Sequence, residues 1–329
     1  MNLHSSCNAG FATTHGHARR RGLLSAALLL IAGMIAAVPA MATSATDAFM
    51  VGTLKVQRHG EQGSPVILIP GLGSGAWVWQ DTIARLQDKH VVYAVTLAGF
   101  DGVPAPARKT GLMDQADASL LQLIDEQHID KPVLIGHSLG GTLAIRFATE
   151  HADRLSGVVA VDGMPIFPGA ERMDAAQRKA TAAGMGAQMA QATPEQFKAQ
   201  QVGYMQVMGV LDAADAERYG AMQARSDAAT VAQYMTEDYA LDLRPALPKI
   251  SVPLLEISPY NTPDFAAAAE HSGQPLIDEA QKTAYYRQLL AGTPQLEVVS
   301  VSPARHFVML DQPQRFHEII EAFLAKAGK

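Results

Sequence analysis

The sequence predicts an α/β fold, in which a mainly parallel, doubly wound sheet carries an inserted helical cap. Short apolar runs alternate with segments of helical periodicity at both ends of the chain, a pattern typical of parallel strands that are buried on both faces. Between residues 164 and 247 this alternation stops, and alanine and methionine become frequent, which favours a helical insertion. The 329 residues, 48% hydrophobic and 18% charged, suffice for one large core with such a subdomain.

The first 42 residues have the pattern of a secretory signal peptide. Arg19-Arg20-Arg21 precedes an apolar run over residues 23–38, and Ala40-Met41-Ala42 forms an A-x-A cleavage signal. We therefore expect cleavage after Ala42 and export to the periplasm or the medium. The alternative is a retained membrane anchor, but the run ends in Pro39 and is short for a spanning helix. The mature protein is accordingly expected to have no stable membrane anchor.

Cleavage would leave an acidic chain without cysteine. Cys7 is the only cysteine and lies in the leader, so neither a disulfide nor a thiolate nucleophile is expected. The formal net charge falls from −6 to −9 when the three leader arginines are removed. No basic block follows the leader, and we expect no nucleic-acid partner.

The first half of the mature chain is expected to alternate strands and helices. Residues 50–59 are predicted to form the first strand, and the continuous apolar run 65–70 predicts a strand buried on both faces. The next expected elements are a helix at 77–86, a strand at 90–97, a helix at 115–127, a strand at 133–135 followed by a helix through 148, and a strand at 157–161.

The second half returns to the sheet after the insertion. Strands are predicted at 252–258 and 296–302, a helix at 279–290, and a closing amphipathic helix at 314–325. We thus expect a core formed by residues 43–163 and 248–329, with a cap at 164–247. Within the cap, helix breaks are predicted at Pro194, Gly203, Gly209 and Gly220.

The candidate nucleophile is Ser138, in the motif Gly136-His137-Ser138-Leu139-Gly140. The motif stands between a predicted strand and a predicted helix. In this context G-x-S-x-G indicates a sharp turn that exposes a nucleophilic serine. Such a turn is tight enough to strain the serine backbone, and a side chain at either glycine would collide with the neighbouring strand and helix. Ser138 is therefore expected at the carboxyl end of a strand, with the Leu139 N–H facing a developing oxyanion.

Three segments, ILIPGLGSG, LIGHSLGG and ARHFVMLDQP, resemble the α/β-hydrolase family with a helical cap. The resemblance covers the chain from about residue 50 to its end and implies the α/β-hydrolase fold. It also implies that Ser138 is the nucleophile and His306 the general base, with the backbone amides of Leu72 and Leu139 forming the oxyanion hole. Many relatives carry histidine before the first glycine of the oxyanion loop, where this chain has Pro70.

The acid of the triad is open between two carboxylates. Most family members carry it in the turn after the strand that follows the cap, but this chain has Asn261 at the expected place and Asp264 three residues further on. Asp162 instead ends the strand after the elbow helix, at the same sheet edge as Ser138, a position that some capped relatives use. We favour Asp162 because a strand end is a rigid mount; its competing interpretation is a turn or helix-capping residue.

These residues predict a serine hydrolase that cleaves an ester-like, apolar small molecule through an acyl-enzyme. No cofactor is expected, and no dense ligand cluster such as H-E-x-x-H predicts a metal. Serine at the elbow argues against epoxide hydrolases and dehalogenases, whereas amide hydrolysis, carbon–carbon bond hydrolysis and cofactor-free perhydrolysis use the same triad. The alternative from another class is a ligand-binding protein with little or no turnover, which the departure at Asn261 favours.

Overall fold

The computed structural model describes residues 47–327. The predicted signal peptide, its cleavage site and Cys7 lie outside these residues. Among the helices that the structure describes, none is both long enough and apolar enough to cross a membrane.

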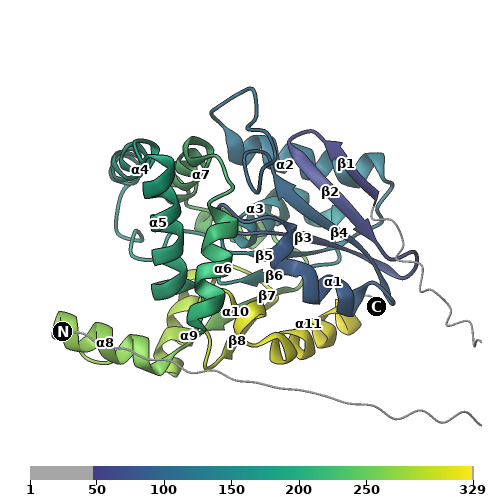
Figure 1. Cartoon of the computed structure of the whole chain (residues 1–329). Helices are drawn as coiled ribbons and strands as arrows, with labels where there is room; N and C mark the ends of the chain where they lie inside the picture. Colours follow the sequence, from purple (N-terminus) through teal and green to yellow (C-terminus); the bar gives the residue numbers. More distant parts are fainter. Residues whose placement is uncertain (1–46, 328–329) are drawn as a thin grey trace, which may run out of the picture. The chain divides into compact units, whose positions relative to one another are not determined.

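An eight-stranded sheet lies at the centre of the described region, in the order β1-β2-β4-β3-β5-β6-β7-β8 (Figure 1). The six strands from β4 to β8 in this order run parallel, and β1 and β2 add an antiparallel edge. The predicted α/β class with a mainly parallel sheet is therefore confirmed. The strands are β1 (Asp47–Val51), β2 (Leu54–His59), β3 (Ser64–Ile69), β4 (His90–Leu97), β5 (Val133–His137), β6 (Gly157–Val161), β7 (Leu254–Pro259) and β8 (Leu296–Val301).

The prediction of one first strand over residues 50–59 is wrong. Gly52 and Thr53 form a turn, and the chain folds back so that Val51 pairs with Leu54 in an antiparallel hairpin. Gly52 has a φ of +53°, and a Cβ there would lie 2.3 Å from the Ser119 hydroxyl oxygen. Only glycine meets both constraints, and it is this turn that splits the predicted strand in two.

Helices cover both faces of the sheet because alternate residues of its buried strands point to opposite sides. Val66 and Leu68 of β3 pack in the core with α1 and α11, whereas Ile67 and Ile69 pack in the core with α2, α3 and α9. The helices outside the insertion are η1 (Ala76–Trp79), α1 (Gln80–Leu86), α2 (Leu112–Glu126), α3 (Leu139–His151), η2 (Ala152–Arg154), α8 (Thr262–Ser272), α9 (Glu279–Leu289), α10 (Val308–Asp311) and α11 (Pro313–Ala327).

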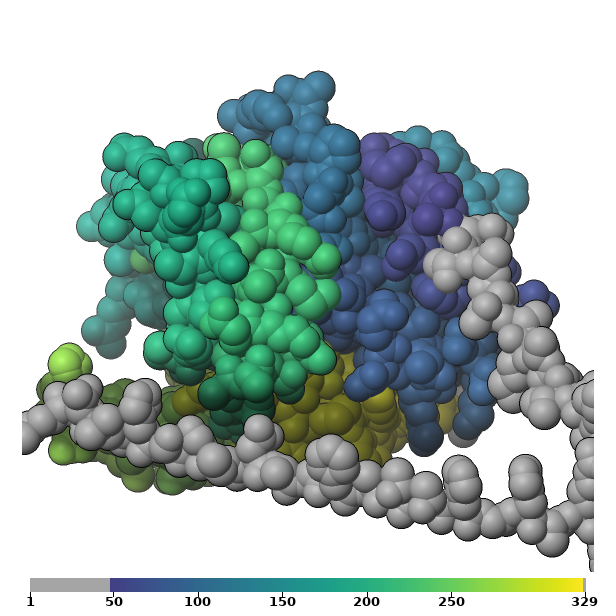
Figure 2. Space-filling view, viewed as in Figure 1, coloured from purple at the N-terminus to yellow at the C-terminus, as the bar shows by residue number. Residues whose placement is uncertain are grey.

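The chain between β6 and β7 forms helices, which Figure 2 shows in teal and green on one side of the visible face. Each of the four long ones starts at a capping Asp or Thr, and Asp174 and Thr193 form complete capping boxes. In pairs, α4 packs against α7 and α5 against α6. These inserted helices are α4 (Ala175–Ala190), α5 (Pro194–Tyr204), the π-helical turn η3 (Met205–Gly209), α6 (Ala213–Gln223), α7 (Ala228–Ala240) and η4 (Arg244–Lys249).

Two of the predicted helix breaks in this segment are wrong. Gly203 lies inside α5 and Gly220 inside α6. A Cβ on Gly220 would lie 2.5 Å from the Cα of Val202, so this glycine lets the two helices approach closely instead of ending one of them. The segment after β7, expected to be a loop, is also helical: α8 begins after Asn261 and carries proline in its first turn, where proline is tolerated.

Candidate active site

Ser138 occupies the sharp turn between β5 and α3. Its φ of 53° and ψ of −119° are in a region that side-chain-bearing residues rarely adopt, at a cost of about 1–3 kcal/mol. The Ser138 N–H donates to the Val161 carbonyl at 2.8 Å, which ties the strained residue to β6. A Cβ on Gly136 would lie 2.1 Å from the Gly140 carbonyl oxygen, so the predicted need for glycine on both sides of the turn is confirmed.

The loop after β3 passes directly against this turn. A Cβ on Gly71 would lie 3.2 Å from the Cβ of Ser138, and Leu72, the next residue, lines the same cavity as Leu139. Leu139 is the first residue of α3, so its N–H has no acceptor within the helix. Gln223 of α6 holds the loop by donating to the Leu72 carbonyl at 3.4 Å. Pro70 stands where many relatives have histidine, and its side chain cannot donate a hydrogen bond. In this chain the loop is instead held by Gln223, from an inserted helix.

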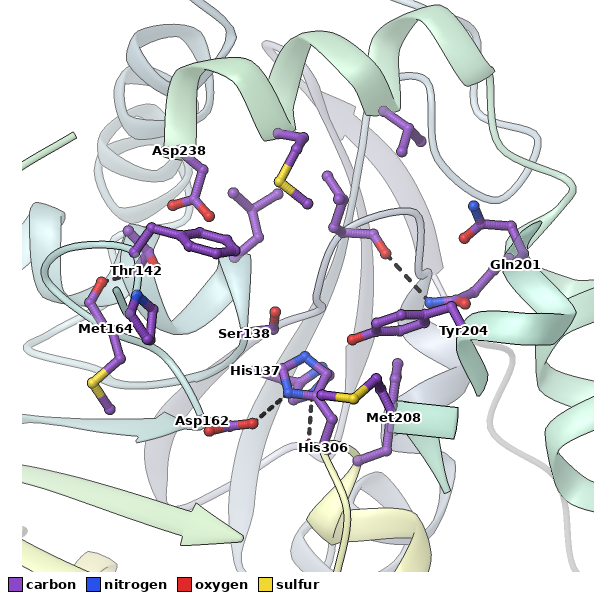
Figure 3. Close-up of a pocket in the computed structure, with 18 of the residues that line it drawn as sticks. His137, Ser138, Thr142, Asp162, Met164, Gln201, Tyr204, Met208, Asp238 and His306 are labelled. Atoms are coloured by element: carbon purple, nitrogen blue, oxygen red, sulfur yellow. Dashed lines mark hydrogen bonds and ion pairs between the residues drawn. The ribbon is translucent and has the colours of Figure 1, made fainter. Parts of the chain in front are cut away.

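The structure brings His306 and Asp162 together beside Ser138 (Figure 3). Asp162 directly follows β6, and His306 lies on the loop between β8 and α10. Nδ1 of His306 is hydrogen-bonded to Oδ2 of Asp162. The imidazole therefore has Nε2 free for a second partner, the arrangement that serine activation requires. The side chains of both residues are largely buried.

The carboxylate of Asp162 has further partners from α9. The Tyr286 hydroxyl donates to Oδ1 at 2.5 Å, and the buried ammonium of Lys282 lies 4.7 Å from the centre of the Tyr286 ring. Burial alone would raise the pKa of Asp162. The Lys282 and His306 charges and the two hydrogen bonds together outweigh burial and hold the pKa of this carboxyl below its usual range, so Asp162 is ionised.

Glu256 of β7 is a second buried carboxyl beside this cluster. Both of its carboxyl oxygens are buried without a hydrogen-bond partner among the described residues. Burial raises its pKa well above the ordinary value, and the Asp162 charge raises it further. The raised pKa favours the neutral form of Glu256, which leaves the ammonium of Lys282 to balance the charge of Asp162.

Asp264, the alternative acid, is bonded elsewhere. Its two oxygens accept hydrogen bonds from the Arg305 guanidinium at 2.7 and 2.8 Å, and Asn261 donates to Oδ2 at 2.7 Å. Arg305 also donates to the carbonyls of Gln206 and Val210, at the end of the inserted helix pair. The structure thus pairs Asp264 with Arg305, the residue before His306. We call this ion pair, together with the bonds of Arg305 to the two carbonyls, the Arg305 clamp.

The backbone of His306 is held from two sides. Its N–H donates to the Met208 carbonyl in η3 at 3.1 Å, and its own carbonyl accepts a hydrogen bond from Nε2 of His137 at 3.0 Å. Burial lowers the pKa of His137, which is therefore neutral and donates through Nε2. The contact between His306 and η3 could not be predicted from the sequence, because nothing in residues 205–209 indicates their partner.

A cavity of about 520 Å³ opens above Ser138, between the sheet edge and the inserted helices. Methionines contribute to its wall at four positions, two of them on inserted helices and one on η3. Tyr204 of α5 also lines it, with its ring edge-on to His306 at 6.1 Å between centroids. The methionines are Met164, Met189, Met208 and Met235.

One set of side chains in the described part of the chain could hold a metal ion. Ligand atoms of Asp117, Glu150 and His151 lie within 4.8 Å of one another. Arg146 approaches Asp117 to 3.9 Å and already supplies a positive charge there. Glu150 and His151 end α3, about 18 Å along the helix from Ser138, so this set is separate from the cavity.

The comparisons with known proteins agree with this geometry. The alpha/beta hydrolase family matches residues 66–319 of the chain. The chain belongs to this family. The fold class predicted from the sequence is the fold of the family, and the protein is a hydrolase.

Individual relatives of the alpha/beta hydrolase family include several esterases. The chain is similar to a pimeloyl-[acyl-carrier protein] methyl ester esterase from Aeromonas hydrophila, at 28% identity over 83% of this chain and 99% of the relative. A thermophilic esterase from Thermogutta terrifontis has the same fold, with a TM-score of 0.66 and 20% identity over 86% of this chain and all of the other. An enol-lactonase from Burkholderia xenovorans gives a TM-score of 0.61 and 22% identity, covering 85% of this chain and 100% of the other.

Proposed function

We propose that the protein is a carboxylic ester hydrolase with Ser138 as nucleophile, His306 as general base and Asp162 as the acid. The observation that carries the proposal is the meeting of these three side chains at one end of a mainly apolar cavity, with Ser138 on a strained turn and His306 bonded to an ionised carboxylate. The substrate is a small, largely apolar molecule, and the residues assigned here need no cofactor.

The proposed reaction begins when the Ser138 hydroxyl attacks the ester carbonyl carbon and its proton passes to Nε2 of His306. Asp162 stabilises the imidazolium cation, and the N–H groups of Leu72 and Leu139 stabilise the negative oxygen of the tetrahedral intermediate. The proton then passes from His306 to the departing alcohol, which leaves an acyl ester on Ser138. Water, deprotonated by the same imidazole, hydrolyses that ester.

Two observations support an ester over an amide or a carbon–carbon bond. The full-length relative from Aeromonas hydrophila is named for methyl ester cleavage, and the solved structure from Thermogutta terrifontis is titled an esterase. In addition, no lysine or arginine lines the cavity among the described residues, which suits an ester without a negative charge.

Initial rates on p-nitrophenyl esters of increasing acyl length, beside the matching anilides, test the proposal. We expect ester turnover that disappears in Ser138→Ala and His306→Ala and survives in Ser156→Ala, a matched control outside the cavity. Faster cleavage of anilides than of esters would contradict ester specificity. Absence of turnover from a folded protein that still binds these compounds would favour the ligand-binding alternative.

We also propose that the protein is exported and matures by cleavage after Ala42, which rests on the leader sequence alone. Mass spectrometry of the protein recovered from the periplasm or medium of a bacterial host should give an N-terminal peptide that begins at Thr43. A protein that stays in the cytoplasm with its leader intact would overturn this proposal.

A further inference from the structure

The cavity contains a second carboxyl group, Asp238 of α7, which the proposed mechanism does not use. The structure gives its side chain no ion pair among the described residues. The hydroxyl of Thr142, which lies beside it in Figure 3, is its one hydrogen-bonding neighbour there and is shared with the Met164 carbonyl at 3.1 Å. Asp238 is therefore a carboxyl that faces the cavity without a charged partner.

The surroundings of Asp238 offer no positive charge to balance it. Among the residues that the structure describes, no lysine or arginine lines this cavity. Charged side chains on α7 itself and on α4, which packs against it, have partners elsewhere: Glu237 accepts from the Met113 N–H at 2.9 Å, and Arg178 of α4 lies 3.6 Å from Asp242. The titratable side chains that line the cavity with Asp238 are His137, Asp162, Tyr204, Tyr286 and His306.

The position of Asp238 indicates which part of a substrate it would meet. Thr142 lies four residues beyond Ser138, just over one turn of α3 and about 6 Å along the helix axis. In Figure 3, Asp238 and His306 lie on opposite sides of Ser138. In the proposed reaction the departing alcohol receives its proton from His306 and so lies on that side. The acyl part of the substrate then extends toward Asp238.

We propose that Asp238 is a specificity-determining residue that selects esters whose acyl chain carries an ammonium group. The choice of a cation follows from charge, because a carboxylate without an ion pair, in a cavity without lysine or arginine, attracts cations and repels anions. The apolar side chains that line the cavity, among them Met164, Ile166 and Met235, accommodate the hydrocarbon segment that joins the ester to the ammonium group.

The ionisation of Asp238 fits this role. Desolvation raises its pKa to about 7, since ionising it in the empty cavity leaves a charge with neither full hydration nor a counter-ion. A bound ammonium group would supply the counter-ion and favour the ionised form. Recognition of the cation should therefore be strongest above the pKa of Asp238 and weaken as the pH falls through it.

The proposal rests on the proposed function, so its test measures binding without turnover. In the Ser138→Ala protein, calorimetric dissociation constants are measured at about pH 8 for matched ethyl esters whose butanoyl to octanoyl chains end in ammonium, methyl or carboxylate. We expect the best ammonium ester to bind about 10- to 100-fold more tightly than its methyl counterpart, the range for a hydrogen bond to a charged group. The carboxylate ester should bind most weakly.

Two variants separate Asp238 from the general charge of the protein. Adding Asp238→Asn, which keeps the shape and removes the charge, should abolish the ammonium preference and relieve the rejection of the carboxylate ester. Adding Glu237→Gln, the same change on the neighbouring residue with its side chain outside the cavity, should leave both unchanged. If the Asp238→Asn protein does not fold, the preference in the Ser138→Ala protein should still fall toward unity as the pH is lowered from about 8 to about 5.

Four results would overturn the proposal. The first three are equal binding of the three esters, tightest binding of the carboxylate ester, and failure of every ester to bind. The fourth is an ammonium preference that survives Asp238→Asn. Because these measurements need no reaction, they remain informative if the wild-type protein hydrolyses nothing. A protein that turns over neutral esters but shows no charge preference would instead retain the proposed function and lose only the role of Asp238.

Discussion

The cavity has an aspartate on each of two sides, and the two aspartates have opposite environments. We call the sheet edge with Ser138, Asp162 and His306 the floor of the cavity, and the inserted helices that cover it the roof. Asp162, on the floor, accepts hydrogen bonds from His306 and Tyr286 and lies near the Lys282 ammonium, so its pKa is below the usual range. Asp238, on the inserted helix α7, has only the Thr142 hydroxyl beside it and no ion pair, and desolvation raises its pKa to about 7. Burial acts on both in the same direction; neighbouring charges and donors decide the outcome.

This difference separates two tasks. A carboxylate whose partners all belong to the protein has one ionisation state and one position, as a triad acid needs. A carboxyl without an ion pair can still pair with a charged ligand. In the ligand-free protein, its burial lowers the stability of the folded state. The rigid sheet edge supplies the first kind, and the inserted helices supply the second. The following predictions test this separation, from the largest expected effect to the smallest.

Replacement of the floor acid should have the largest effect. Asp162→Asn removes the charge that stabilises the imidazolium, and we expect kcat on a responsive ester to fall about 10³- to 10⁴-fold. The same change at Asp264, which is bonded to Arg305 instead of His306, should cost about tenfold or less. Steady-state kinetics of the two purified variants compare them directly. A larger loss in Asp264→Asn than in Asp162→Asn would reverse the assignment of the acid.

The partners of Asp162 should have a smaller effect. Tyr286→Phe removes one donor to the carboxylate and should lower kcat/KM about 10- to 100-fold. Lys282→Met removes the ammonium that helps to depress the pKa of Asp162, so that pKa should rise and activity should be lost at a higher pH on the acid side. Profiles of kcat/KM from about pH 4 to pH 8 measure both effects. Tyr285→Phe, whose hydroxyl bonds to Glu171, is the matched control, and an equal loss there would argue against a role specific to Tyr286.

Loss of the Arg305 clamp, which links the loop of His306 to the inserted helices, should lower activity less than loss of the partners of Asp162. Arg305→Gln breaks the pair with Asp264 and the bonds to two carbonyls of the inserted segment, which loosens the backbone that carries His306. We expect kcat to fall about tenfold, since each lost bond is worth about 1 kcal/mol, while the surface control Arg85→Gln retains full activity. Unchanged kinetics in Arg305→Gln would mean that His137 and the backbone bonds alone position His306.

The smallest effect should be on stability and should have the opposite sign. The raised pKa of Asp238 means that the folded state holds a proton that the unfolded chain loses near pH 4, so the native aspartate lowers stability increasingly from about pH 4 to about pH 7. Asp238→Asn should thus melt a few degrees higher than wild type at pH 7 and above, with the difference vanishing toward pH 4. Calorimetry at these pH values checks the sign, and a lower melting temperature at neutral pH would contradict an unpartnered carboxyl.

The residues on the cavity floor were easier to predict from the sequence than those in its roof, for a physical reason. Ser138 and Asp162 each follow an apolar strand, and parallel strands bring their carboxyl ends to one edge, so local pattern and topology together place these residues. The hairpin at Gly52 and helix α8 were missed because a single turn residue, or a proline in a first helical turn, decides between continuing and stopping an element.

The contacts that distinguish Asp162 from Asp264 could not be predicted in this way. They depend on Tyr286, Lys282 and Arg305, which come from segments more than 40 residues away from the carboxylates that they contact. The orientation of Asp238 toward the cavity depends likewise on how α7 packs against α4 and α2. Such pairings leave no periodic signal in a single sequence.

Covalent labelling of Ser138 tests the central claim most directly. The purified protein is incubated with a fluorophosphonate, and its intact mass and peptide map are compared with those of the Ser138→Ala and His306→Ala proteins. We predict rapid addition of one phosphonyl group on Ser138 in the wild type and none in either variant, because the hydroxyl needs the imidazole to become nucleophilic. A folded wild-type protein that is not labelled, or is labelled equally fast without His306, would contradict an activated serine on the cavity floor.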